Sequence, residues 1–155
     1  MRGKRAKIRP VTPDPKYKSE IVAKIVNRVM QHGKKTLATE LVHNAIEDLA
    51  KATNEEPMQA LDKALGNVKP TIEVRSRRVG GATYQVPVPV EEKRQQFLAI
   101  SWLVEAARSK TGTDFGSLLA KELISAHKGE GEAMKKKQDV ERMADANKAF
   151  AHFRW

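Results

Sequence analysis

Residues 69–90 constrain the fold most, because they are the one stretch of the chain that cannot be interpreted as helix. Ile72 and Val74 alternate with charged neighbours, and this period of two is typical of a β-strand. Gly80 and Gly81 follow, and two adjacent glycines readily take the positive φ angles of a tight hairpin turn. A second alternating run of β-branched residues comes after the turn. The pattern predicts a hairpin.

Two prolines in the second strand limit what can pair with it. Pro87 and Pro89 have the same parity, so both missing N–H donors lie on the same edge of the strand. That edge cannot accept a third strand. We therefore expect a two-stranded antiparallel β-ribbon over residues 71–90. Such a ribbon is marginally stable alone and needs a body to anchor it.

The rest of the chain has helical periodicity and is long enough, at 155 residues, for one domain. We expect a mainly α fold, with about six helices in a single domain and the ribbon protruding between helices 3 and 4. The predicted organisation is a basic N-terminal arm at 1–18, a helical domain at 19–148 and an aromatic, basic tail at 149–155. No run approaches the ~20 apolar residues of a membrane span. A soluble protein, monomeric when free and without a membrane partner, is the expectation.

Three segments carry specific packing predictions. Apolar residues surround most of the fourth helix, Phe97 and Trp102 among them, which predicts that it is the central helix of the core. The sixth helix has only a thin apolar edge and is predicted to pack weakly. The tail contains three aromatic residues, Phe150, Phe153 and Trp155, which we expect either to stack on nucleic-acid bases or to fold back on the core.

Positive charge is concentrated in three places. The net charge is +10. It divides into +6 over residues 1–18, +3 over 69–94 and +3 over 135–155, while 19–68 and 95–134 each come to −1. Basic segments separated by near-neutral helices indicate a surface that binds a polyanion, with a merely solubilising surface as the alternative.

No motif for catalysis or for a metal is evident. The histidines at 32, 43, 127 and 152 lack metal-ligand spacing, and the chain has no cysteine. Residues 33–36, Gly-Lys-Lys-Thr, resemble the end of a phosphate loop but follow a predicted helix instead of a strand. We therefore expect no enzyme activity, no cofactor and no metal, and we assign these cations to a nucleic-acid backbone.

Four stretches together resemble the ribosomal protein seven family of the small subunit, in its bacterial form. They are residues 20–44 with the run Met30-Gln31-His32-Gly33-Lys34-Lys35, the ribbon at 68–87, the block at 94–103, and the ending at 135–155. The resemblance implies a structural constituent of the small subunit that binds the 3′ major domain of 16S rRNA directly and nucleates assembly of the 30S head. It also implies a place near the exit-site tRNA and the mRNA path, contact with neighbouring head and platform proteins, and a cytoplasmic location in the ribosome.

The resemblance also implies site residues. The rRNA-binding set is Arg2, Lys4, Arg5, Lys7, Arg9, Lys34, Lys35, Arg75, Arg77, Arg78, Arg94, Lys135, Lys136 and Lys137. The set near tRNA and mRNA is Gly80, Gly81, Thr83, Tyr84, Arg142, Met143, Phe153, Arg154 and Trp155.

Two other classes of function are compatible with the organisation of the chain alone. The first is a DNA-architectural protein whose basic β-arm enters the minor groove of a bent duplex. The second is an enzyme that acts on RNA. The aromatic tail suits looped or single-stranded RNA better than duplex DNA, because unstacked bases offer the faces on which aromatic rings stack.

Overall fold

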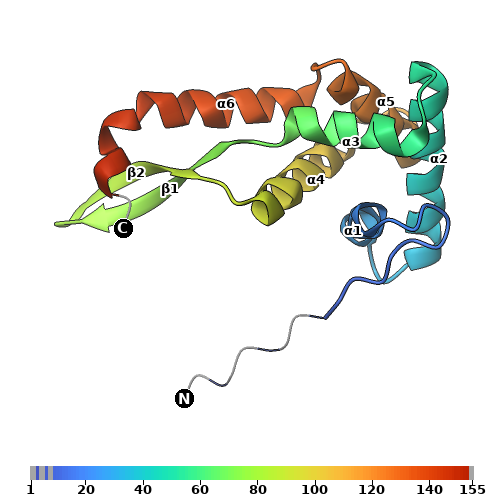
Figure 1. Ribbon diagram of the computed structural model, residues 1–155, viewed down its shortest axis with the longest axis horizontal. Helices are drawn as coiled ribbons and strands as arrows, with labels where there is room; N and C mark the ends of the chain where they lie inside the picture. The colour runs from blue at the N-terminus through green and yellow to red at the C-terminus, as the bar shows by residue number, and fades with distance from the viewer. Residues whose placement is uncertain (1–2, 4–5, 7–8, 154–155) are drawn as a thin grey trace.

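The computed structural model describes residues 3, 6 and 9–153 and consists of a helical body with a two-stranded ribbon extending from one side (Figure 1). The elements in order are α1 (Glu20–Val29), α2 (Lys35–Thr53), α3 (Pro57–Val68), β1 (Ile72–Val79), β2 (Ala82–Pro89), α4 (Glu92–Ser109), α5 (Phe115–His127), α6 (Glu132–Ala146) and the 3₁₀-helix η1 (Lys148–Phe153). This arrangement confirms the predicted fold class. In the described part of the chain no helix is both long enough and apolar enough to span a membrane.

The helix starts follow local sequence rules. Ser19 caps α1, its hydroxyl accepting a hydrogen bond from the backbone N–H of Ile21 at 3.2 Å. Asp114 caps α5 in the same way through the N–H of Ser117 at 3.1 Å. Pro57 occupies the first turn of α3, where its missing N–H has no helical partner to lose. These residues set where each helix begins.

The core lies where the helices of the body cross. α5 packs against α2, α3 and α4, and α4 also contacts α1, α3 and α6. α4 thus contacts four other helices, but α5 does so too, and neither Phe97 nor Trp102 is buried, so the predicted central position is not particular to α4. The largest fully buried apolar side chains of this core are Ile46, Leu49, Leu61, Leu65, Leu119, Val22, Val26, Val42, Val68 and Val104.

The ribbon has the predicted hairpin geometry. β1 and β2 are antiparallel, and the pair formed by Val79 and Ala82 closes a two-residue turn. Gly80 and Gly81 both have positive φ, at 57° and 92°. A side chain with a Cβ rarely adopts this conformation, which explains why two glycines stand there. Among the described residues the sheet has only these two strands, as the proline parity predicted.

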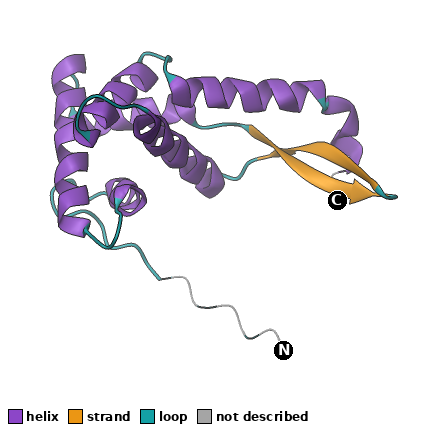
Figure 2. Cartoon of the chain, turned by 180° about the vertical axis from the view of Figure 1, so that it is seen from behind, coloured by secondary structure: helices purple, strands orange, loops and turns teal. Residues whose placement is uncertain are grey.

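α6 supports the ribbon along its length. Figures 1 and 2 show α6 running from the body over the ribbon toward its distal end, and α6 contacts both strands while η1 contacts β2. Val86 on β2 and Ala144 on α6 are buried but lie outside the main core. The thin apolar edge of α6 therefore packs on the ribbon. This differs from the prediction of a weakly packed sixth helix.

A buried carboxylate joins α6 to the body. Glu122 on α5 is completely buried, and it accepts hydrogen bonds from the ammonium of Lys110 at 2.5 Å and from the backbone N–H of Ala133 at 3.0 Å. Gly131 has a φ of +101°, and a Cβ there would lie 2.8 Å from the Glu122 carboxylate. Only glycine therefore allows α6 to begin this close to α5.

Candidate nucleic-acid interface

The base of the ribbon is organised around one buried acidic residue. Glu73 is 8% exposed, although the alternation of β1 predicts that it faces solvent with the arginines. Its carboxylate accepts hydrogen bonds from the Nε of Arg75 at 2.6 Å and from the Nε of Arg94 at 3.3 Å. Arg94 comes from α4, so this ion pair ties the ribbon to the body. Arg75 and Arg94 are thereby held in place, with part of their charge neutralised.

The distal half of the ribbon carries cations without such partners. Arg77 and Arg78 are adjacent in β1 and so point to opposite faces of the ribbon. Neither forms an ion pair within the residues that the structure describes. Gly80, Gly81 and Thr83 are exposed at the turn beyond them. The ribbon end thus offers two charged guanidiniums and accessible backbone.

The end of the chain packs on the ribbon. The ring of Tyr84 on β2 lies 5.2 Å from the ring of Phe150 and 4.9 Å from the ring of Phe153, measured between centroids. Of the two predicted uses of the tail, neither describes this contact: the rings pack on the ribbon and not on the helical core. We call these three residues the aromatic clasp. Arg142 and Met143 on α6 are exposed nearby in the sequence.

A basic pocket lies where the α1–α2 link meets the α4–α5 link. Lys34 lines this cavity of about 430 Å³ together with His32, Arg108 and Lys110. Lys34 and the neighbouring Lys35 are both exposed. Arg108 donates a hydrogen bond to the carbonyl of Val29 at 3.1 Å. This carbonyl lies at the C-terminal end of α1, where the helix dipole favours a cation.

The three lysines of α6 have separate partners. Lys135 pairs with Glu132 at 2.7 Å, and Lys137 donates to the backbone carbonyl of Asn67, near the end of α3, at 2.7 Å. Lys136 pairs with Glu105 at 3.0 Å. That ammonium, aided by the Arg28 guanidinium, outweighs burial and holds the pKa of the Glu105 carboxyl below its ordinary value. Lys137 thus contributes to the fold, while Lys135 and Lys136 remain exposed.

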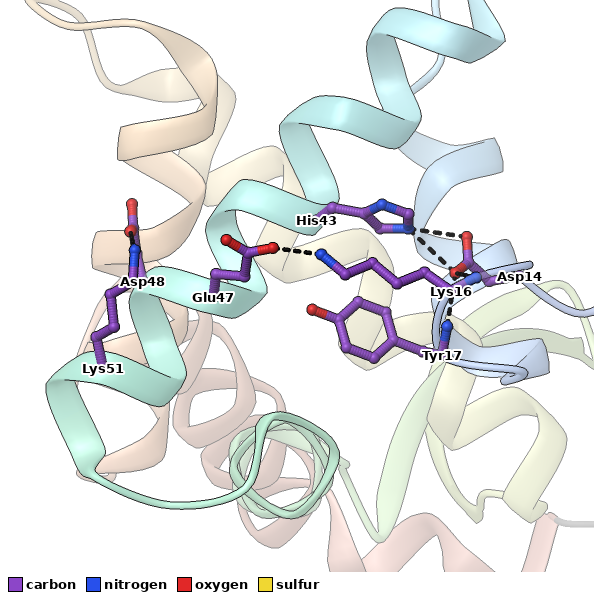
Figure 3. Close-up of polar contacts among 7 residues, drawn as sticks. All are labelled: Asp14, Lys16, Tyr17, His43, Glu47, Asp48 and Lys51. Atoms are coloured by element: carbon purple, nitrogen blue, oxygen red, sulfur yellow. Dashed lines mark hydrogen bonds and ion pairs between the residues drawn. The ribbon is translucent and has the colours of Figure 1, made fainter.

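The N-terminal segment is docked on α2 through Asp14 (Figure 3). The Asp14 carboxylate accepts hydrogen bonds from the backbone N–H groups of Lys16 and Tyr17, both at 3.0 Å, and lies 3.0 Å from the Nε2 of His43. Lys16 pairs with Glu47 on the same helix. Docking thus begins four residues before the predicted end of the arm. Of the arm residues predicted to bind rRNA, Arg9 is exposed, and Arg2, Lys4, Arg5 and Lys7 lie outside the described residues, as do Arg154 and Trp155 of the tail.

The docking of this segment is expected to depend on pH in the acid range. Burial opposes ionisation of Asp14, but the hydrogen bonds from Tyr17 and His43 outweigh it and lower the pKa of this carboxyl below its ordinary value of 3.8. A lowered folded-state pKa stabilises the protein fully above 3.8, and this contribution is lost as the pH falls through the folded-state value. Asp14→Asn should lower the free energy of unfolding by about 1 kcal/mol at neutral pH. It should also flatten the acid limb of a profile of that free energy against pH, measured by urea unfolding. An acid limb identical to that of the wild type would contradict this role for Asp14.

An exposed aromatic residue marks a feature that sequence reasoning missed. Phe97 on α4 is 51% exposed, although its apolar character predicts a place in the core. It lies in the second turn of α4, before the first buried residues of that helix, Ala99 and Ile100. The surrounding groove is lined from α1 by Lys24, Asn27 and Arg28. Phe97 has Lys93, Arg94 and Ser101 as neighbours at helical spacing, and this mixture of polar neighbours is the signal that could have found the groove.

Three of the four histidines contact other groups of the protein. His43 contacts Asp14, His127 lies 3.0 Å from Glu55, and His152 bonds to the backbone carbonyl of Ala149. Within residues 3, 6 and 9–153 there is no group of three or more His, Cys, Asp or Glu side chains placed to hold a metal ion. The described surface therefore offers cations, exposed backbone and aromatic rings, which are the groups that contact folded nucleic acid.

Comparison with known proteins gives matches over all or nearly all of the chain. A family model described as "Ribosomal protein S7p/S5e" matches residues 1–148. The chain is 54% identical over 155 residues to the "Small ribosomal subunit protein uS7" of Thermosipho africanus, with 100% of both chains covered. It is 50% identical over 155 residues, again with 100% of both covered, to the protein of that name from Thermotoga maritima, and 50% identical over 154 residues, 99% of each, to that of Treponema denticola.

Proposed function

The chain belongs to the ribosomal protein S7p/S5e family, and from this premise we propose that it binds the 3′ major domain of 16S rRNA directly and nucleates assembly of the 30S head. It is a structural protein of the small ribosomal subunit and not an enzyme, and its place is the ribosome in the cytoplasm. The proposal concerns which RNA it contacts and through which residues.

One observation carries the proposal. Arg9, Lys34, Lys35, Arg77 and Arg78 are predicted RNA anchors, and within the described chain none of them has a carboxylate partner. An unpaired surface cation retains its full charge for a phosphate, and its binding releases counterions. Among the other described anchors, Arg75, Arg94, Lys135 and Lys136 do have carboxylate partners, so the proposal depends most on the five unpaired cations.

The second part of the proposal concerns the distal end of the ribbon. We assign the exit-site tRNA and the mRNA path to the side of the molecule where the turn residues, the aromatic clasp, Arg142 and Met143 lie. The exposed glycine turn lets a nucleic-acid backbone approach closely, and the clasp holds Tyr84 in a fixed position. Neighbouring head and platform proteins are further partners under this proposal, with the arm at 1–18 and the tail at 149–155 as extensions that contact them or rRNA.

A competition experiment tests the RNA assignment. The protein is bound to a labelled transcript of the 3′ major domain, and unlabelled transcript or duplex DNA of equal length is added. We expect the rRNA transcript to compete at concentrations about 10³-fold lower than the DNA, since specific sites exceed non-specific binding by at least this factor. Equal competition by both would sink the proposal and favour the DNA-architectural alternative.

A further inference from the structure

The groove between α1 and α4 has the size of a ligand site. It has a volume of about 490 Å³, within the roughly 300–1,000 Å³ range of small-ligand clefts. Its lining includes the buried Ile100 and the half-exposed Phe97. None of the residues predicted from the sequence to bind RNA lines it.

Two arginines hold the Phe97 ring in an electropositive setting. The Cζ of Arg94 lies 5.3 Å from the ring centroid and that of Arg28 lies 5.9 Å from it, both within the range of cation–π contacts. Each guanidinium is itself fixed by a carboxylate, Arg94 by Glu73 and Arg28 by Glu105 at 3.0 Å. The ring and its two cations therefore form a preorganised unit, and Phe97 as a residue is still 51% exposed.

The charge of the groove selects its occupant. Lys24, Arg28 and Lys93 line it, and no carboxylate does. An apolar, aromatic surface whose charged neighbours are all cations, with Asn27 and Gln96 as neutral polar neighbours, matches a flat π-system attached to a negatively charged backbone. An apolar side chain of a protein could fill the groove, but it would bring no charge to Lys24 and Lys93, which have no carboxylate partner among the described residues.

A buried hydroxyl adds a specific polar group. Ser101 on α4 lines the same groove, is 5% exposed, and forms no hydrogen bond with any residue that the structure describes. Buried polar groups are rarely left without a partner, because a group that loses its hydrogen bonds to water on folding and gains none in the protein destabilises the fold. A hydroxyl can donate or accept, so one staggered rotation of the side chain toward the groove would serve either edge of a base.

We propose that this groove receives one unstacked nucleobase of the bound rRNA, which stacks on Phe97 and bonds to the Ser101 hydroxyl, while Lys24 and Lys93 contact the flanking phosphates. The inference rests on the proposed rRNA binding and adds a base-recognition site to it. Stacking contributes affinity without releasing counterions, so it differs from the phosphate contacts in how it responds to salt.

The test compares Phe97→Leu with Phe97→Tyr in binding to the 3′ major domain transcript over a range of salt. Leucine keeps an apolar side chain but removes the π-face, and we expect the affinity to fall about 10-fold, within the roughly 5- to 150-fold range of one base stack. Tyrosine should restore wild-type affinity. The slope of log K against log salt should be the same for all three proteins, and circular dichroism should show equal helix content.

Ser101→Ala supplies an independent readout. Removing a buried hydroxyl without a partner should leave the thermal midpoint unchanged or raised, while the affinity for the transcript falls roughly 2- to 12-fold. If Ser101 had only a structural role, its removal would not lower the affinity for the transcript while leaving the thermal midpoint unchanged. If Phe97→Leu binds the transcript with wild-type affinity, the inference is overturned and the proposed function is left intact. If that variant binds the transcript normally but is incorporated poorly into small subunits, the groove receives a protein, and the inference is again overturned. Failure of the wild-type protein to bind the transcript overturns the proposed function itself.

Discussion

The double variant Arg77→Ala/Arg78→Ala is expected to bind the 3′ major domain about 30-fold more weakly than wild type at ~0.1 M salt, and its slope of log K against log salt should be smaller by up to about two units. For the wild type, neutralisation of about eight phosphates gives a slope of roughly 6 to 7. The two guanidiniums point to opposite faces of the ribbon and have no carboxylate partner in the described chain, so each can neutralise a separate phosphate. The measurement is a salt titration of binding by filter retention or fluorescence anisotropy.

A matched control separates local contact from total charge. Lys51→Ala/Lys121→Ala also removes two positive charges, but from α2 and α5, which belong to the body and lie away from the ribbon. This variant should change the slope little. Helix content of both variants should equal that of wild type, because all four side chains are at least partly exposed. If the two double variants lose affinity equally, net charge and not the ribbon determines binding, and Arg77 and Arg78 leave the set of backbone contacts.

Shortening the ribbon is expected to have the second large effect. Deleting residues 76–79 and 82–85 joins Arg75 to Val86 through Gly80 and Gly81. These two residues face each other in the register, four positions from the natural closing pair, so the alternation of the strands is preserved. The ribbon loses about 13 Å, together with Arg77, Arg78 and Tyr84. We expect rRNA binding at least as weak as in the double arginine variant, with the body still folded.

We expect a folded body because its core contains no residue of either ribbon strand. A shorter deletion, of residues 78–79 and 82–83, is the control: it closes on the pair Arg77 and Tyr84 and retains the residues of the aromatic clasp. Its loss of affinity should be intermediate. Thermal melts followed by far-ultraviolet circular dichroism test the division into body and ribbon, and a melt of the longer deletion that shows general loss of helix argues against it.

The backbone was largely predictable because its signals are local. The glycine pair and the shared parity of Pro87 and Pro89 lie within one hairpin, and the observed strands, residues 72–89, differ from the predicted ribbon by one residue at each end. The helix caps at Ser19 and Asp114 depend on contacts two or three residues away. Interactions at this range can be inferred from residue order alone.

The side-chain environment of the site was not predictable, because it depends on elements that meet only in the fold. Glu73 is buried by the approach of Arg94, which is 21 positions away along the chain, and Lys137 is engaged by a carbonyl 70 positions away. The apolar character of Phe97 predicts a core residue, but the packing of α1 and α4 leaves it half-exposed. The contact of the tail with Tyr84 likewise requires that α6 follow the ribbon, which its thin apolar edge does not reveal. The RNA-contact assignments themselves stay predictions.

The support of the ribbon by α6 and η1 also sets an order of events during synthesis. The nascent chain emerges N-terminus first, so the hairpin is complete before either of its two C-terminal supports has been made. Apart from Ala133 of α6, the core is supplied by α1 to α5, so the body can bury most of its core once α5 has been made, whereas the hairpin acquires both of its supports only when the last residues have been made. A product released early, before α6, therefore keeps a foldable body whose hairpin lacks both surfaces that hold it.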